Sequence, residues 1–518
     1  AATGGVVVMD HWDTGQGAEP NTSAPSEGDQ FLQLQHSSGD AGIVSQTIAT
    51  EVGASYQLEF DYSAVDFGAR SSTITYDVGG SDQTVTFTSQ AGQKAWATES
   101  YQFTATATTT TLSFEGAHFS GFWGVSIDDV IVTVLPATSD ISDTIIVNDD
   151  ASPITATLDI NQDYALTATT SIVLGAGTGA GFVNQSNGTV TTASLTVNSS
   201  ATGDTSQYNL SGGSLEATAT VVNNAGELNF TGGSMKSNGA ITVNSGGTFT
   251  VNRSDTVTQG TDFGGGGISG AGAVEQNGSG TLVLNAANSY SGGTTVNAGT
   301  LDLVGQNRID GALTVDGTGV VKLSGTSHNA GTAIDSITLQ NGGTFTDDSQ
   351  GSFVQSVFAP ITFNNGGTMT SEAGSNGLGG FGNFLFINGI NVTGTGLATI
   401  SANGISFNFG GAITVADTVA GAGTDLLISS SIKNERVGTK TKAGVGTLTL
   451  TGINTDTSPW SITGGTLEIG GAGQLQSGSY ANTIANNGTF AYNSSANQIL
   501  SGVISGSGSL VKNGTGTL

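Results

Sequence analysis

Short apolar strands, separated by Gly, Asn, Ser and Thr, return at a nearly constant interval through most of this chain. The motif GTL starts at Gly280 and again at Gly299, and it recurs with the same interval at Gly446 and Gly465. The related motifs GGSL and GGSM, which start at Gly212 and Gly232, are separated by almost the same distance along the chain. A period of roughly 20 residues that tolerates insertions is typical of a solenoid, in which each coil stacks only on its neighbours.

The length and composition of the repeats also predict the kind of solenoid. Each repeat has room for only short strands, with inward-facing candidates such as Leu282, Leu284, Leu301 and Leu303. The turns are rich in Asn-Gly and Gly-Gly, since Gly and Asn adopt positive φ at low cost. No repeat is long enough for a helix, which excludes leucine-rich and ankyrin-like arrays. We therefore predict an all-β chain that contains a long right-handed parallel β-helix.

This β-helix is expected over residues 144–518, in about 18 coils of about 20 residues each. Pairs of Asn recur at equivalent places in NNAGELNF (223–230), NNGGTMTS (364–371) and NNGTFAYN (486–493). Identical residues in stacked coils lie above one another, so these segments predict Asn ladders at one corner of the coil.

Residues 1–136 follow a different pattern. Eight short segments alternate or run apolar, with Gly, Ser and Asp between them: QFLQLQ, GIVSQTIAT, YQLEFDYSA, STITYDVG, QTVTFTS, WATESYQFTA, TTLSFEG and GVSIDDVIVTVL. Strands spaced this way predict an antiparallel β-sandwich, and their number is that of a jelly roll. The polar stretch 137–143 is expected to link this domain to the β-helix.

Composition narrows the function classes. The formal net charge of −29 disfavours binding to nucleic acid or to anionic lipid surfaces, although local carboxylate clusters could hold divalent cations. The absence of Cys excludes disulfides, thiolate metal sites and a Cys nucleophile. No apolar run approaches the roughly 20 residues of a membrane-spanning helix.

Both ends of the sequence bear on export. The start AATGG is the kind of small-residue segment that remains after cleavage of a signal peptide. The chain stops at LVKNGTGTL, within another copy of the repeated motif, so we expect the natural protein to continue past residue 518.

The N-terminal segments PSEGDQFLQLQ, YQLEFDYSA and GVSIDDVIVT resemble the jelly-roll modules that include carbohydrate-binding modules and MAM-like domains, over about residues 25 to 135. This resemblance implies a structural calcium held by Glu27 or Asp29 together with Asp128 or Asp129. Adjacent strand residues point to opposite faces, so only one of the last two could reach a given ion. The alternative is that both carboxylates end a strand in water.

The same resemblance suggests that Trp12, Tyr62 and Trp123 form a flat platform for sugar rings. The alternative is that they belong to the core, because buried Trp is common in small sandwiches.

A second resemblance concerns the array. GSGTLVLNAANSYSGGTTVNAGTLDL (278–303) resembles the autotransporter-associated β-strand repeat of passenger domains, and GVGTLTLTGINTDTSPWSITGGTLEI (444–469) is similar to a diverged copy. This resemblance implies an exported bacterial protein of the cell surface.

Candidate chemistry in the array is sparse. Lys236, Arg253, Arg308 and Lys322 are predicted to be isolated, and KNERVGTKTK (433–442) is predicted to be a polar loop that projects from a coil. The one His, His328, is expected in a solvated turn, as are the carboxylates of the Asp pairs 149–150 and 347–348. We find no catalytic constellation.

The sequence therefore favours a non-enzymatic, extracellular bacterial surface protein: a β-helical stalk, adhesin, fibre or surface-layer subunit. Its partners would be a glycan or a second copy of the chain, bound through the N-terminal module, and its cofactor would be calcium. The alternative is a polysaccharide lyase or glycosidase with an attached carbohydrate-binding module, which requires a carboxylate pair beside a basic residue.

Overall fold

The computed structural model divides the chain into two units, Ala1–Thr138 and Ser139–Leu518, each described by itself. The structure describes residues 32–34, 43–64, 71–88, 96–116, 125–135, 137–141, 143–148, 155–177, 179–198, 205–236, 239–305, 308–325, 329–330, 334–350, 354–379, 381–408, 412–421, 423–434 and 438–518. Apart from a single 3-10 turn at Gln476–Gly478, the regular structure of these residues consists of strands.

The first unit is an antiparallel β-sandwich, as predicted. One sheet has the order β1 (Leu32–Gln33), β8 (Val125–Leu135), β3 (Ser55–Ala64) and β6 (Ala97–Thr104). The other has the order β2 (Ile43–Ala49), β7 (Thr109–Gly116), β4 (Ser71–Val78) and β5 (Asp82–Thr88). All eight predicted strands are present.

The two sheets meet in an aromatic core. The Phe60 ring of β3 lies edge-on to Tyr76 and Phe114 of the other sheet, at centroid distances of 5.2 and 5.0 Å. Phe60 and Phe114 are fully buried because apolar residues alternate with polar ones along each strand, which places one apolar face of each sheet inside.

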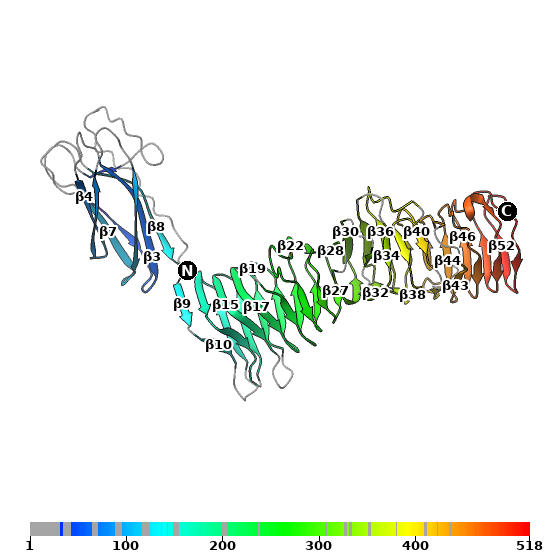
Figure 1. Cartoon of the computed structure of the whole chain (residues 1–518), viewed down its shortest axis with the longest axis horizontal. Helices are drawn as coiled ribbons and strands as arrows, with labels where there is room; N and C mark the ends of the chain where they lie inside the picture. Colours follow the sequence, from blue (N-terminus) through cyan, green and yellow to red (C-terminus); the bar gives the residue numbers. More distant parts are fainter. Residues whose placement is uncertain are drawn as a thin grey trace, which may run out of the picture. The chain divides into compact units, whose positions relative to one another are not determined.

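The second unit is a parallel β-solenoid, and Figure 1 shows its strands stacked in chain order from β10 to β52. Its longest sheet contains β11 (Ala156–Ile160), β14 (Gly181–Gln185), β16 (Gln207–Leu210), β18 (Glu227–Phe230), β21 (Thr248–Val251), β24 (Ala273–Gln276), β27 (Thr294–Val296), β29 (Gly311–Asp316), β32 (Ile334–Gln340), β35 (Ile361–Asn364), β38 (Ile390–Thr393), β41 (Ala412–Val415), β43 (Lys440–Ala443), β45 (Trp460–Ile462), β48 (Ile484–Asn486) and β51 (Ile504–Ser505). Each coil contributes one strand to this 16-stranded sheet. The coils are fewer than the sequence predicts, because inserted loops lengthen many of them beyond the basic repeat.

A 12-stranded sheet forms a second face. It contains β22 (Thr256–Thr258), β25 (Thr281–Leu284), β28 (Thr300–Val304), β30 (Val320–Ser324), β33 (Thr344–Asp348), β36 (Gly367–Ser371), β39 (Ala398–Ile400), β42 (Leu426–Ile428), β44 (Thr447–Leu450), β46 (Thr466–Ile469), β49 (Thr489–Tyr492) and β52 (Ser509–Lys512).

The remaining strands form three shorter sheets. A 10-stranded sheet contains β9 (Ala137–Ile141), β10 (Thr144–Val147), β12 (Tyr164–Ala168), β13 (Ser171–Leu174), β15 (Thr189–Val197), β17 (Ser214–Val222), β19 (Ser234–Lys236), β20 (Ile241–Val243), β23 (Ile268–Gly270) and β26 (Ser289–Tyr290). A four-stranded sheet contains β31 (Asn329–Ala330), β34 (Gln355–Val357), β37 (Phe384–Phe386) and β40 (Ile405–Phe407), and a two-stranded sheet pairs β47 (Ser479–Tyr480) with β50 (Ile499–Leu500). Strand β9 thus occupies most of the range in which the sequence predicts a linker.

The first GTL pair confirms the predicted construction. Leu282 pairs with Leu301 and Leu284 with Leu303 on successive strands of the 12-stranded sheet, and all four side chains are buried. The segment between them carries β26 and β27, so one coil contributes strands to three sheets.

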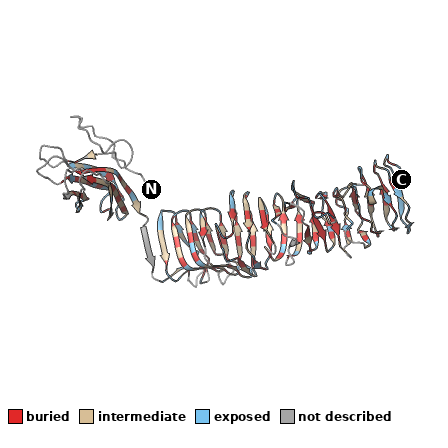
Figure 2. Cartoon of the chain, turned by 45° about the horizontal axis from the view of Figure 1, so that its top comes forward, coloured by how far each residue is buried: buried red, intermediate tan, exposed pale blue. Residues whose placement is uncertain are grey.

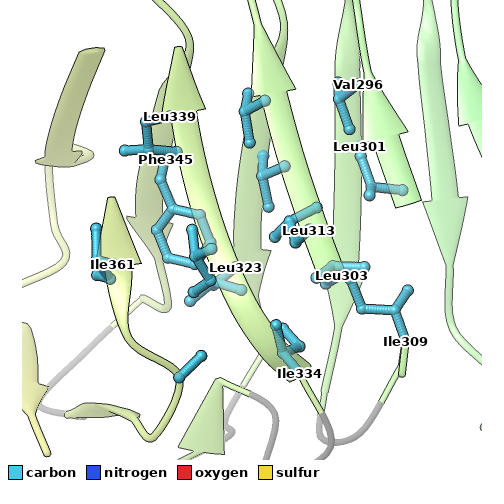
Figure 3. Close-up of a cluster of buried hydrophobic side chains, with 14 of the residues drawn as sticks. Val296, Leu301, Leu303, Ile309, Leu313, Leu323, Ile334, Leu339, Phe345 and Ile361 are labelled. Carbon is cyan, nitrogen blue, oxygen red and sulfur yellow. The ribbon is translucent and has the colours of Figure 1, made fainter. Parts of the chain in front are cut away.

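The inner faces of the solenoid's sheets join in one continuous hydrophobic core from Val147 to Tyr492, visible as the buried residues along the solenoid in Figure 2. Figure 3 shows part of it, in which Leu301, Leu323 and Phe345 of the 12-stranded sheet lie near Leu313, Leu339 and Ile361 of the 16-stranded sheet.

The second GTL pair does not continue the columns of the first. Following the pairing from strand to strand, Leu282 aligns with Leu450, and Leu448 of the second motif belongs to the neighbouring inward column. The motif has therefore moved by two residues along the strand between the two repeats. Both columns point inward, because side chains alternate with a period of two.

Asn ladders run along the outside of the coils. The side-chain amides donate to the preceding coil in three series: Asn229 to Asn209 to Asn184 to Asp159, Asn244 to Asn223 to Asn198, and Asn365 to Asn341 to Asp316. Ladders are thus present around Asn223 and Asn365, but the prediction of one corner is wrong, because Asn223 follows β17 of the 10-stranded sheet and Asn365 follows β35 of the 16-stranded sheet. In the third predicted segment, Asn486 donates instead to the backbone carbonyl of Ser509 and Asn493 to Glu468.

Candidate functional site

The carboxylates of the N-terminal module gather where β3 pairs with β8. Asp61 lies directly opposite Asp128, and the register shifts between Glu59 and Asp61 to accommodate an extra residue on β8. Asp129 occupies this bulge with a φ of 47°, and its N–H donates to the Asp128 carboxylate at 3.0 Å. The bulge interrupts the period of two on which the predicted opposite orientation of Asp128 and Asp129 depends.

Asp61 adds a carboxylate that sequence reasoning missed. Thr98 donates to its Oδ1 atom at 2.6 Å. Like charges directly opposite one another destabilise a strand pair, and a cation between Asp61 and Asp128 would offset that repulsion. The other predicted calcium ligands, Glu27 and Asp29, lie outside the described residues. Among the residues that are described, no group of three or more carboxylate or imidazole side chains is placed to hold a metal ion.

Tyr62 belongs to the inner face of the sandwich. Its ring lies edge-on to Phe87 at 5.9 Å and tilted against Phe60 at 6.1 Å. Burial and the nearby charge of Glu99 raise the pKa of its hydroxyl. These are the contacts of a residue at the margin of the core, and Trp12 and Trp123, the other two members of the predicted sugar platform, lie outside the described residues.

Glu99 is an acidic residue on the inner side of the edge strand β6. It accepts a hydrogen bond of 2.9 Å from the Tyr76 hydroxyl. The Tyr101 ring, on the same strand, lies edge-on to Tyr76 at 5.9 Å. Aromatic rings beside a carboxylate can stack on sugar rings and accept hydrogen bonds from their hydroxyls. We call Tyr62, Tyr76, Glu99 and Tyr101 the edge cluster.

On the solenoid, Lys322 is not isolated, contrary to the prediction. The pairing of β28, β30 and β33 places its Nζ atom 3.4 Å from Asp302 and 3.1 Å from Asp348. Partial burial alone would lower the pKa of the Lys322 ammonium, but hydrogen bonds and charge attraction from Asp348 and Asp302 outweigh burial and raise it. Lys322 therefore stays protonated and is a poor general base.

The segment 433–442 is not a projecting loop over its described part, since its last three residues begin strand β43. Lys440 and Lys442 both point inward and are buried. The Nζ atom of Lys442 donates to the backbone carbonyls of Ala443, Gly444 and Gly464 at 2.9 to 3.1 Å. Burial lowers the pKa of Lys442 to about 8. The prediction failed because it treated both lysines as solvated charges, whereas the coil supplies them with internal acceptors.

The Asp pair at 347–348 is not solvated either. Asp347 is fully buried on β33, in the column that holds Leu284, Leu303 and Leu323 in earlier coils. Its carboxylate accepts hydrogen bonds from buried donors on two consecutive coils: the backbone and hydroxyl of Ser349 and the amide of Gln355 on its own coil, and Ser375 and Asn383 on the next. We call this set the polar core. His328 lies outside the described residues.

Together, these observations define a parallel β-solenoid protein with an N-terminal β-sandwich. Residues 274–303 and 441–469 match the family described as passenger-associated-transport repeat, and they include both GTL pairs. Residues 3–133 match the family described as protein of unknown function, DUF642. The repeats point to a secreted or surface-exposed protein. No helix among the described residues has the length and hydrophobicity of a membrane span.

Two solved structures share weak similarity with the chain. One, described as "CBM4 structure and function", is 18% identical over 20% of this chain and 70% of that chain, with a TM-score of 0.15. The other, described as "Crystal structure of Agl-KA catalytic domain", is 11% identical over 97% of this chain and 100% of that chain, with a TM-score of 0.14. With TM-scores this low, neither structure informs the activity of this chain. A comparison with curated proteins finds no match.

Proposed function

We propose that this protein is a non-enzymatic component of a bacterial cell surface, in which the β-solenoid is a stiff stalk and the N-terminal sandwich is a binding module. The observation that carries this proposal is the uninterrupted 16-stranded parallel sheet, stacked on one continuous core. Each interior coil is held to both neighbours by backbone hydrogen bonds and buried side chains, so a load along the stack is shared among the coils.

The chemistry of the binding module favours a neutral or weakly basic glycan as its ligand. The edge cluster places the partly exposed rings of Tyr62 and Tyr101 and the Glu99 carboxylate at the border of the sandwich, and the Tyr76 ring, which contacts Glu99 and Tyr101, is buried. A strongly acidic ligand would be repelled by this carboxylate and by the net charge of −29. Calcium bound by Asp61 and Asp128 would stabilise the opposite, outward side of β3.

Two measurements on the purified full chain test this proposal. Negative-stain electron microscopy should show rods, either isolated or joined into filaments, and compact particles would contradict a stalk. Affinity electrophoresis in gels that contain neutral polysaccharides should show retardation that is lost in Glu99→Gln and Tyr101→Ala proteins. Thr47→Ala, on the outward face of the other sheet, is the matched control. Binding that is unaffected by both cluster variants would exclude the edge cluster as the binding site.

A polysaccharide-degrading enzyme is the second candidate, and the grouping of Lys322 with Asp302 and Asp348 favours it. In this grouping Lys322, which the sequence predicted to be isolated, lies between two carboxylates, as the enzyme alternative requires. The raised pKa of Lys322 argues against catalysis, because a lyase needs a neutral base to abstract a proton. Incubation with acidic and neutral polysaccharides distinguishes the two functions: release of unsaturated or reducing sugars that is lost in Lys322→Met would establish an enzyme.

A further inference from the structure

A lysine and an aspartate meet inside the solenoid, away from the surface. Lys440 begins β43, and Asp456 lies in the segment that leads to β45, the next strand of the 16-stranded sheet. The Nζ atom of Lys440 is 3.2 Å from Oδ1 of Asp456, and their side chains are only 6% and 4% exposed. The two residues thus belong to consecutive coils and are held in contact by the pairing of β43 with β45.

The surroundings favour the uncharged forms of both groups. Burial lowers the pKa of Lys440 despite the attraction of Asp456, and burial raises the pKa of Asp456 despite the attraction of Lys440. The Phe407 ring centroid is 5.9 Å from Nζ. An ion pair in such a place carries a desolvation penalty that its mutual attraction only partly offsets, so the neutral pair, an amine beside a carboxylic acid, is closer in free energy to the ion pair than it would be in water.

Ser458 connects the two groups. Its hydroxyl accepts a hydrogen bond of 2.9 Å from Nζ of Lys440 and donates one of 2.9 Å to Oδ1 of Asp456. Tyr480 donates to the backbone carbonyl of Ser458 at 2.7 Å, which helps to hold the segment in position. The hydroxyl can therefore pass a proton from the nitrogen to the carboxyl oxygen without the help of solvent.

We propose that Lys440 and Asp456 condense to an intramolecular amide. The lone pair of the neutral Nζ attacks Cγ of the protonated Asp456 carboxyl group, and a C–N bond forms. The Cγ–Oδ1 bond breaks, and Oδ1 leaves as water with its own proton and one proton that Ser458 relays from Nζ. No oxidant, reductant or other reactant is needed, and enforced contact between the two groups supplies the high effective concentration that such a condensation requires.

The chain contains a matched comparison two residues away. Lys442 is equally buried on the same strand, but its Nζ atom contacts three backbone carbonyls, which cannot be acylating partners. The proposed reaction is therefore specific to Lys440. The resulting bond would tie two consecutive coils together covalently, whichever of the functions above the protein has.

Mass spectrometry of the denatured full chain, purified in folded form, tests the proposal. The intact mass is expected to be lower than the sequence mass by one water molecule. After trypsin digestion, peptide 437–442 should stay joined to peptide 443–512, because an acylated Lys440 is not cleaved. An intact mass equal to the sequence mass would overturn the proposal.

Four variants show which residues lose the water molecule. Each variant is first verified as folded by far-ultraviolet circular dichroism. Lys440→Arg and Asp456→Ala should have their full sequence masses. Asp456→Asn should lose ammonia and reach the same final mass as the unaltered chain, because the product is the same amide. Lys442→Arg should still lose one water. A Lys440→Arg protein that still loses water would place the dehydration elsewhere and overturn the assignment.

Discussion

Gly299, the glycine of the second GTL motif, offers a direct test of how tightly the coils stack. Its φ is +60°, and a Cβ atom added there would lie 2.3 Å from the carbonyl oxygens of both Gly278 and Gly280 in the coil below. Gly317 has nearly the same φ, +56°, but the nearest atom to its added Cβ is 3.9 Å away. Substituting Ala at each position therefore imposes the same backbone strain and differs only in the clash between coils.

The two substitutions should differ by about 3 kcal/mol. A left-handed conformation costs Ala about 1 to 2 kcal/mol, partly offset by about 0.5 kcal/mol from the less flexible unfolded chain, so Gly317→Ala should destabilise by about 1 kcal/mol. Gly299→Ala must also displace its strand, which costs about 1 to 3 kcal/mol for overpacking and about 1 kcal/mol for a weakened ladder hydrogen bond. The bond at risk joins the Thr300 N–H to the Gly280 carbonyl at 2.9 Å.

Hydrogen exchange is the appropriate assay, because long repeat arrays need not unfold in a single step. Amide exchange in peptides that contain β25 and β28 reports the local free energy of opening. In Gly299→Ala, this exchange should be faster than in Gly317→Ala by about a hundredfold, the factor that corresponds to about 3 kcal/mol. Gly465→Ala should behave like Gly299→Ala, since its Cβ would lie 2.3 Å from the Gly446 carbonyl oxygen. Equal exchange in the Gly299→Ala and Gly317→Ala proteins would refute the reasoning.

Three further outcomes are expected. Phe345→Ala should lower the local opening free energy by about 3 to 5 kcal/mol through the cavity it leaves, while Phe345→Leu should lower it much less; equal exchange rates would contradict a packed core. Lys442, with a pKa of about 8 in the folded state against 10.5, binds fewer protons when folded, so its contribution to the unfolding free energy should rise from pH 8 to 10.5. Denaturation midpoints of the unaltered chain and of Lys442→Met, compared across that range, should diverge accordingly. Calcium should raise the melting temperature of the full chain relative to EDTA, and Asp128→Asn should abolish the increase; no shift in the unaltered chain would exclude calcium.

The regular part of the fold could be predicted from the sequence because it depends on local rules. The two-residue alternation located all eight strands of the sandwich, and the interval between GTL motifs located successive strands of the solenoid. The coil number was overestimated because inserted loops do not disturb the stack. The two-residue displacement of the GTL motif along the strand, between its first and second pairs, could not be predicted from the sequence either. An inserted loop can bring the motif into either of the two inward-facing columns.

The burial of polar residues inside the solenoid was not predicted from the sequence. Lys440, Lys442 and Asp347 lie in segments whose composition is typical of a solvated loop or turn, yet all three side chains are buried. Their partners, such as Asp456 and Asn383, are distant in sequence or lie one coil away, so no local pattern could pair them. The alternation of Lys with Thr in KTKA was the one available signal, because it matches the alternation of inward and outward positions on a strand.

The polar core around Asp347 has a consequence for how such a repetitive chain finds its fold. Coils of similar length rich in Gly, Thr and Leu could stack on the wrong neighbour and still bury a similar apolar area, so hydrophobic contacts discriminate weakly between correct and slipped arrangements. Asp347 finds its donors on Ser375 and Asn383 only when the coils follow in the native order. A slipped coil would leave the buried Oδ2 atom of Asp347 without donors, although Ser349 and Gln355 of its own coil would still donate to Oδ1, and an unsatisfied buried acceptor costs about 1 to 3 kcal/mol. These few polar residues therefore specify the order of the coils, and misfolded species should be rarest in the region they occupy.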